Sequence, residues 1–324
     1  MKKLFTLFAA ALCCASMFAV EVVLPGKFTI NADGDQVRFS SWSIQTKSDR
    51  VGITFNTVIG TEQYGSISTY GHYFAWGTGD DPGYTSYKIF FVDWGDYLVD
   101  GDGNLIDLQL RTLSADEWQY LLSGRENAEY LCGLAQITNK AGNGGYQGLM
   151  LFPDDAYAVS VGYSLEFSDD LEFVPYKNTK QFGFNYNQYT YEQWKQLEAL
   201  GAVFLQATTI FVNNEPISGT LPDEMKDVIY WTSTSASNSG SSVPLAKALY
   251  INEVSYKKID KVLVDTPRNF QLVVRLVHDV TAEEQGIENI ATPADKARKV
   301  MMDGTLYIAT PDGKIYNTTG VQVK

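Results

Sequence analysis

Two short stretches of the sequence carry the same helix-start pattern, and they constrain the fold more than any other feature. In the first, RTLSADEWQYLLSGR, Ser114 and Glu117 are spaced as a capping box, in which each side chain bonds the backbone N–H of the other residue. Leu113 before the cap and Trp118 in the first turn are spaced as a hydrophobic staple. We therefore predict a helix that begins after Ser114, buries Trp118 and ends at Gly124, because glycine commonly terminates helices.

The second stretch, YTYEQWKQLEALG, repeats this pattern. Thr190 and Gln193 take the positions of the capping box, and Trp194 forms a staple with the tyrosine that precedes the cap. We expect Leu197 and Leu200 on the buried face of this helix. Two short helices in a chain otherwise rich in strand patterns predict an α+β fold.

The composition is that of a folded protein that does not bind nucleic acid. The chain has 324 residues and 45% hydrophobic residues, which is enough for a sizeable core. Its 17 Phe and 20 Tyr residues favour β structure, because aromatic side chains suit a half-buried pleated surface. A formal net charge of -13 excludes a nucleic-acid partner, since phosphate binding requires a basic field.

The first 19 residues have the pattern of a cleavable secretory signal. Lys2 and Lys3 precede an apolar run that ends in small residues, and this run is too short to span a bilayer comfortably. Lipidation at Cys13 or Cys14 is an alternative that the sequence leaves open. Removal of the signal leaves Cys132 alone, so we expect no internal disulfide, no transmembrane segment, and a buried structural role for this thiol.

Alternating apolar residues predict the strands. The pattern around Asp33 and Gly34 is typical of a hairpin, with Phe28, Val37 and Phe39 on one face. We divide the chain into a signal (1–19), one α+β domain (20–280), a charged linker (281–298) and a small β module (299–324). Further strands are expected at residues 149–152, 202–207, 229–234 and 248–251, and residues 270–277 are predicted to form one central strand that closes the domain.

No catalytic motif is present. Only two histidines occur, His72 and His278, and a nucleophile elbow is missing, so a histidine-based metal site or triad has little support. The paired acids Asp154 and Asp155 are expected in a solvated turn, because sequence adjacency does not set the carboxylate separation that glycoside hydrolysis needs. A hydrolase with an acidic site remains the last of three functional alternatives.

Calcium is the one cofactor that a motif suggests. Asp100, Asp102 and Asn104 place oxygen atoms at alternate positions, as a calcium loop does. However, Leu105 stands where such a loop requires glycine, and Arg111 stands where it requires glutamate. An ordinary acidic turn is the preferred interpretation, and we expect no other cofactor.

Ligand binding is expected from aromatic and hydroxyl side chains on loops, although core packing is the alternative role for each of them. The candidates are Tyr84, Tyr87, Tyr186, Tyr189, Ser233 and Ser235. Other side chains border apolar segments and are expected to anchor the structure: Arg111, Trp118, Arg125, Trp194, Trp231 and Arg275.

The segments FAWGTG, DWG, RTLSADEWQYLLSGR, GLMLFPDD, YTYEQWKQLEALGAVFL, YWTST and VVRLV follow one another in this order. Together they resemble the Fibrobacter-type major paralogous domain of exported bacterial proteins, over most of residues 28–278. That group is related to the fold of C-type lectins and formylglycine-generating enzymes. The resemblance implies an α+β domain with paired terminal strands, two short helices flanking antiparallel sheet, and long ligand-binding loops.

The chain departs from the enzyme branch of this group, which uses two cysteines where the mature chain has only Cys132. We therefore expect a non-enzymatic protein that recognises an extracellular glycan or protein through the loops at residues 60–81 and 233–244. A structural or adhesive role in the cell envelope is the second alternative.

The last residues, 299–324, resemble the C-terminal sorting signal of type IX secretion through DGTLYI and YNTTGVQVK. This resemblance implies that the secretion machinery is a partner and that the protein is secreted or lies on the exterior of the outer membrane. It leaves open whether the module is cleaved off or anchors the protein.

Overall fold

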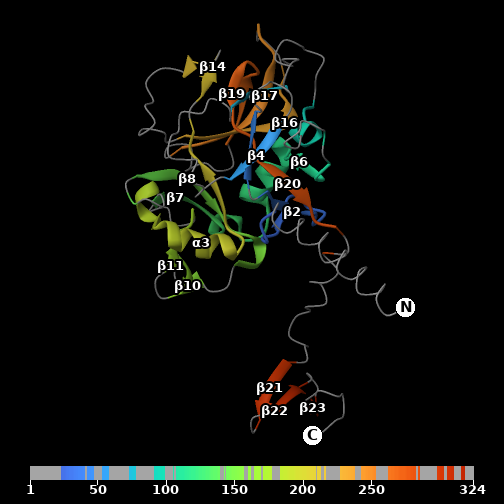
Figure 1. Cartoon of the computed structure of the whole chain (residues 1–324), viewed down its shortest axis with the longest axis vertical. Helices are drawn as coiled ribbons and strands as arrows, with labels where there is room; N and C mark the ends of the chain where they lie inside the picture. Colours follow the sequence, from blue (N-terminus) through green and yellow to red (C-terminus); the bar gives the residue numbers. More distant parts are fainter. Residues whose placement is uncertain are drawn as a thin grey trace, which may run out of the picture. The chain divides into compact units, whose positions relative to one another are not determined.

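The structure is a computed structural model in which two compact units are distinguished, Met1–Asp279 and Val280–Lys324 (Figure 1). The predicted signal, most of the predicted linker, and the segments that hold Tyr84, Tyr87 and Asp100 lie outside the described residues. The residues that the structure describes are 23–40, 42–46, 53–57, 73–77, 91–98, 105, 107–138, 142, 144–156, 160–161, 164–168, 171–176, 183–208, 210–212, 215–216, 227–237, 242–252, 262–281, 284, 298–302, 305–309 and 315–317.

The first sheet of the larger unit pairs strands from near the two ends of that unit's described chain, β2 and β20. The predicted hairpin is confirmed, because β1 and β2 pair antiparallel with Phe28 opposite Val37, and both side chains are buried. Strand β2 also pairs antiparallel with β20, which pairs in turn with β6. The strands are β1 (Phe28–Thr29), β2 (Gln36–Phe39), β20 (Leu276–Asp279) and β6 (Leu110–Thr112).

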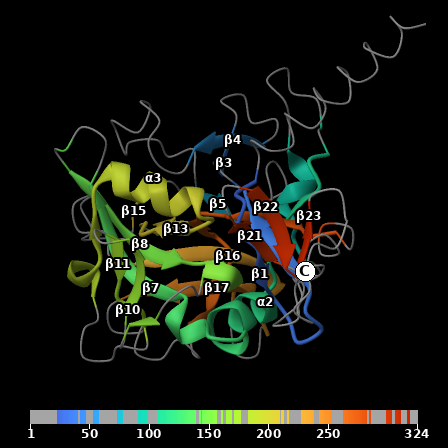
Figure 2. The ribbon, with the colours of Figure 1, turned by 90° about the horizontal axis from the view of Figure 1, so that it is seen from below.

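A second sheet lies beside helix α3 (Figure 2). Its central pair consists of β7 and β8, and β12 is parallel to β7 while β13 is antiparallel to β8. Gly148 permits the approach of β13, because a Cβ at this position would lie 2.3 Å from the carbonyl oxygen of Leu205. The predicted buried strands are confirmed as β8 and β13. The strands are β12 (Gln188–Tyr189), β7 (Cys132–Thr138), β8 (Gly145–Leu151) and β13 (Val203–Gln206).

A third and a fourth sheet hold the Trp-rich half of the core. Strands β16 and β17 pair antiparallel on either side of the predicted Ser-rich loop, and β18 follows β17. The other sheet has the order β15-β14-β19-β5. The strands are β16 (Val228–Ser235), β17 (Leu245–Ile251), β18 (Leu263–Pro267), β15 (Glu215–Pro216), β14 (Phe211–Val212), β19 (Phe270–Leu272) and β5 (Phe74–Ala75).

The prediction of one central strand at residues 270–277 is wrong. The chain forms β19 and β20, which belong to two different sheets. Between them Val273 makes a parallel bridge with Tyr230, and its carbonyl oxygen accepts from the N–H of Trp231 at 2.9 Å. This contact with β16 explains the interruption, since it draws the chain away from one sheet before it joins the next.

The remaining described strands form smaller sheets. In the larger unit β9, β10 and β11 form one antiparallel sheet, and β3 pairs with β4. The smaller unit holds the antiparallel strands β21, β22 and β23. The bounds are β9 (Ser160–Val161), β10 (Ser164–Ser168), β11 (Leu171–Phe173), β3 (Trp42–Thr46), β4 (Ile53–Thr57), β21 (Arg298–Met302), β22 (Thr305–Ala309) and β23 (Ile315–Asn317).

The first predicted helix is confirmed as α2 (Ala115–Gln119), which continues as a π-helical turn, η5 (Tyr120–Gly124). Both bonds of its capping box are present, and Leu113 and Trp118 are fully buried. Gly124 is required because a Cβ there would lie 2.6 Å from the ring of Tyr120. Helix α2 contacts β16 and β17.

The second predicted helix is confirmed as α3 (Tyr191–Ala199), again with a complete capping box. Trp194 and Leu197 are buried as expected. The expectation for Leu200 is wrong, because this residue is 52% exposed. The helix ends one residue earlier, and Gly201 turns the chain with a φ of 93°.

The described part of the chain is therefore α+β, mostly antiparallel sheet with two short α-helices. Its buried apolar side chains form three clusters. The first joins the first sheet and α2 to side chains of the second sheet and of β16 and β17, the second surrounds Trp76 and Trp231, and the third lies between the second sheet and α3.

Candidate functional site

The described ends of the two predicted binding loops are joined to each other. The indole N–H of Trp76, in the described part of the first loop (residues 73–77), donates to the carbonyl oxygen of Thr232 at 2.8 Å. The indole N–H of Trp231, beside the second loop, donates to the carbonyl oxygen of Phe74 at 2.6 Å. Both indoles are fully buried, so these reciprocal bonds hold the two loop ends at a fixed separation.

Arg268 completes this arrangement. Its guanidinium carbon lies 4.2 Å from the ring centroid of Trp76, and its Nε donates to the carbonyl oxygen of Leu245 at 2.9 Å. Its backbone accepts from the N–H of Trp76 at 2.8 Å and donates to the carbonyl oxygen of Pro244 at 3.0 Å. We call Trp76, Trp231 and Arg268 the loop platform. Sequence patterns did not single out Arg268, because a lone arginine near a strand carries no motif.

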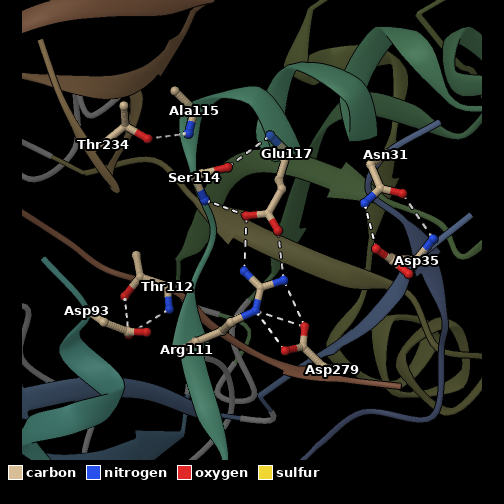
Figure 3. A network of polar contacts seen from close by, with 10 residues as sticks. All are labelled: Asn31, Asp35, Asp93, Arg111, Thr112, Ser114, Ala115, Glu117, Thr234 and Asp279. Carbon is tan, nitrogen blue, oxygen red and sulfur yellow. Dashed lines mark hydrogen bonds and ion pairs between the residues drawn. The ribbon is translucent and has the colours of Figure 1, made fainter. Parts of the chain in front are cut away.

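Beyond the platform, the end of β16 contacts the segment at residues 91–98, which precedes β6. Phe91 makes an antiparallel bridge with Thr234, and the N–H of Val92 donates to the carbonyl oxygen of Ser233 at 3.1 Å. The hydroxyl oxygen of Thr234 accepts from the N–H of Ala115 at 3.0 Å, which ties β16 to the first residue of α2 (Figure 3).

Two predicted ligand-binding residues do not have the expected exposure. Ser233 is 1% exposed, because both its backbone groups bond to neighbouring segments, and its hydroxyl has no partner among the residues that the structure describes. Tyr189 is 5% exposed, and its hydroxyl donates to the carbonyl oxygen of Glu172 at 2.7 Å. Burial raises the pKa of Tyr189. Both expectations are corrected, because a buried side chain offers no surface to a ligand.

The remaining predicted binding residues lie in different parts of the molecule. Tyr186 is 48% exposed and lies in the turn η8 (Phe184–Tyr186), next to β12. Ser235 is half-buried at the end of β16, in a different sheet. The described residues thus form no single site from these two side chains. Tyr84 and Tyr87 lie outside the described residues.

The candidate calcium ligands Asp100, Asp102 and Asn104 also lie outside the described residues. Within the described ranges, no three His, Cys, Asp or Glu side chains are placed to hold a metal ion. His278 is half-buried in β20, and its Nδ1 lies 3.1 Å from the carbonyl oxygen of Gln109.

Arg111, predicted as an anchor, connects the helix cap to the end of the domain (Figure 3). Its Nη2 lies 2.7 Å from Oε1 of Glu117, and its Nε lies 2.8 Å from Oδ1 of Asp279. Burial lowers the pKa of Arg111, but the bonds with Asp279 and Glu117 outweigh this effect and the pKa is raised. The guanidinium is therefore a permanent cation between two carboxylates.

Arg125, a second predicted anchor, makes a buried ion pair. Its side chain is 1% exposed, its Nη1 donates to Oδ1 of Asp154 at 2.8 Å, and its Nη2 donates to the carbonyl oxygen of Phe152 at 2.9 Å. Asp154 also accepts from the N–H and the hydroxyl of Thr29 at 2.8 and 2.7 Å. The expectation that Asp154 lies in a solvated turn is wrong, because its carboxylate neutralises a buried cation.

Cys132 is fully buried, as predicted. Its thiol donates to the carbonyl oxygen of Ala128 at 3.4 Å, and burial raises its pKa to about 12, although Arg125 opposes the shift. The thiol is therefore protonated at neutral pH and unsuited to nucleophilic chemistry.

The other predicted anchors are buried as well. Trp118, Trp194 and Trp231 are each at most 2% exposed. Arg275 is buried in the crossing segment between β19 and β20. All four therefore contribute to packing rather than to an open surface.

Comparisons of the chain with family models, with curated proteins and with solved structures found no match. In the part of the chain that the structure describes, neither α-helix has the length and apolar character needed to cross a membrane.

Proposed function

We propose that this protein is an exported, non-enzymatic domain of lectin-like α+β fold that recognises an extracellular glycan or protein. The binding surface consists of the loops at residues 60–81 and 233–244. The observation that carries this proposal is the loop platform, because two buried hydrogen bonds of Trp76 and Trp231 join the described part of the first loop to the residues that precede the second loop. Variable loops on a rigid base are a common arrangement for recognition.

Other features support the lectin-like assignment. The terminal strands β2 and β20 pair, and both α-helices lie in the same unit as the antiparallel sheets. Such a pairing and such helices are what the resemblance to the exported bacterial domain implies.

The same proposal extends to export. The unit Val280–Lys324 contains a three-stranded antiparallel sheet, which supports a separate sorting module that contacts the secretion machinery. The protein is then secreted or held on the exterior of the outer membrane. Mass spectrometry of the exported protein tests this part, because it identifies the end that is removed.

Binding to a glycan array and a pull-down of extracellular proteins test the recognition itself. The variant replaces residues 61–65 of the first proposed loop, Thr-Glu-Gln-Tyr-Gly, with a glycine-serine segment of equal length, and the control makes the same replacement at residues 139–143, between β7 and β8. We expect the wild-type chain and the control to retain a ligand that the variant loses. If both assays are empty for the wild-type chain, the proposal is rejected.

A structural or adhesive role predicts a different result from the same protein. Concentration-dependent polymerisation of the purified chain, measured by light scattering, would favour that role over recognition of a soluble ligand.

A further inference from the structure

Phe91 differs from every other phenylalanine whose burial the structure describes. It is 61% exposed, whereas the others are buried or half-buried. A single exposed apolar side chain is common on protein surfaces and needs no explanation by itself. The neighbours of Phe91, however, make its ring a candidate for contact with a ligand.

The backbone is held at Phe91 and at the residues that follow it. Phe91 is bridged to Thr234, and the next residue, Val92, is bonded to β16. Asp93 then caps the short helix η4 (Trp94–Tyr97), and its carboxylate accepts from the N–H of Thr112 at 2.9 Å. The ring of Phe91 therefore projects from a rigid base rather than from a mobile chain.

A hydroxyl group stands next to this ring. Residues directly opposite each other in an antiparallel bridge place their side chains on the same face, about 5 Å apart. Thr234 is half-buried, and its hydroxyl oxygen accepts from the N–H of Ala115. Its own proton is not donated to any residue that the structure describes. An apolar ring and a hydrogen-bond donor are thus adjacent.

The charged residues in the segments around Phe91 and Thr234 are unfavourable for anionic ligands. The described segments 91–98, 233–237 and 242–244 contain no lysine, arginine or histidine. They contain the acids Asp93 and Asp96. The whole chain has a net charge of -13. A sulfated, sialylated or uronate sugar would meet repulsion here.

We propose that Phe91 and Thr234 form a subsite for one neutral sugar unit, with the ring of Phe91 against the C–H face of the sugar and the hydroxyl of Thr234 donating to a sugar oxygen. This inference rests on the proposed recognition function and specifies its ligand class. Thr234 belongs to the proposed binding loop at residues 233–244, and Phe91 extends the proposed binding surface beyond that loop.

The test uses the full exported chain on an array of neutral and acidic oligosaccharides, followed by calorimetry with the neutral oligosaccharide that gives the highest signal. We expect Phe91→Ala to weaken binding about tenfold, because the ring loses its apolar contact with the sugar. Phe91→Trp should retain binding. The matched control is Tyr97→Ala, which removes another exposed ring from the same segment and should leave binding unchanged.

Thr234 is tested with two substitutions, because its side chain also bonds to α2. Thr234→Ser keeps the hydroxyl and should bind like the wild-type chain, whereas Thr234→Val should bind about fivefold more weakly. The unfolding midpoint of each variant, measured in urea, separates this effect from a loss of folding.

Three results would each contradict the proposal of a neutral-sugar subsite. Equal binding by Phe91→Ala and Tyr97→Ala would show that the ring makes no contact, while the proposed recognition function would stand. A preference for acidic oligosaccharides would contradict the ligand class. An empty array together with a protein retained in the pull-down would replace the sugar with a protein ligand at the proposed loops.

Discussion

At the scale of single residues, the ion pair between Arg125 and Asp154 makes the sharpest prediction. The guanidinium is almost fully buried, and Asp154 is its carboxylate partner at 2.8 Å. Asp154→Ala leaves that buried cation without its counter-charge, so we expect the free energy of unfolding to fall by about 2–4 kcal/mol. Urea denaturation followed by Trp fluorescence measures the change.

The neighbouring acid provides the control for this substitution. Asp155 is exposed, and Asp155→Ala should change the free energy of unfolding by less than about 0.5 kcal/mol. Equal effects of the two substitutions would contradict the assignment of Asp154 as the neutralising group.

The sequence predicted contacts between residues that are separated by no more than one helical turn. Ser114 and Glu117 are three positions apart, and helical geometry makes their capping bonds a consequence of that spacing. Arg125 and Asp154 are 29 positions apart. Nothing in the intervening chain specifies that they meet, so the sequence indicated an anchoring arginine without identifying its partner.

At the scale of elements, α2 and α3 share a capping box but differ in what the third helical residue contacts. Glu117 is a carboxylate that pairs with Arg111 and also bonds the N–H of Ser114, whereas Gln193, which bonds the N–H of Thr190, is neutral and cannot form an ion pair. We therefore expect Glu117→Ala to lower the free energy of unfolding by about 1 kcal/mol more than Gln193→Ala, because it also breaks a charged hydrogen-bond pair. Urea denaturation of both variants measures the difference.

A conservative variant separates the two roles of this glutamate. Glu117→Gln keeps an acceptor for the N–H of Ser114 but removes the negative charge that faces Arg111, so it should cost less than Glu117→Ala by the contribution of the capping bond. If Glu117→Ala and Gln193→Ala cost the same, the contact with Arg111 adds nothing to stability.

Long apolar patterns predicted whether a segment is a helix or a strand. They did not predict the residues at which each helix or strand begins and ends. The paired strands β16 and β17 follow from apolar runs on either side of a Ser-rich loop. The break between β19 and β20 does not, because the apolar run continues through Val273 while a contact with distant Tyr230 interrupts it. Leu200 fits the helical period, yet the helix ends before it.

At the scale of the whole molecule, the candidate surface was predictable only as two loops. The resemblance to a known family indicated each loop separately, but the bonds of Trp76 and Trp231 that join them cross more than 150 positions of chain. The sequence also grouped Tyr186 with Ser235, but Tyr186 lies in the turn η8 next to β12, and Ser235 ends β16 in another sheet. Residue type therefore indicates the chemistry of a site, while the sheet order determines which residues share it.

The position of β20 makes a prediction about the limits of the larger unit. This strand lies between β2 and β6, so it holds the first sheet together, and Leu276 and Val277 are fully buried. A chain that ends at Thr281 keeps the strand, and we expect its free energy of unfolding to match the full chain within about 0.5 kcal/mol, because the smaller unit is compact by itself.

A chain that ends at Arg275 lacks only six further residues but loses β20. Burial of Leu276 and Val277 alone contributes about 3–6 kcal/mol, which is a large part of the 5–15 kcal/mol that holds a typical domain folded. We expect this shorter chain to lose its near-ultraviolet circular dichroism and its cooperative urea transition. Cooperative unfolding of the shorter chain, or failure of the longer one to fold, would show that β20 is not the strand that closes the domain.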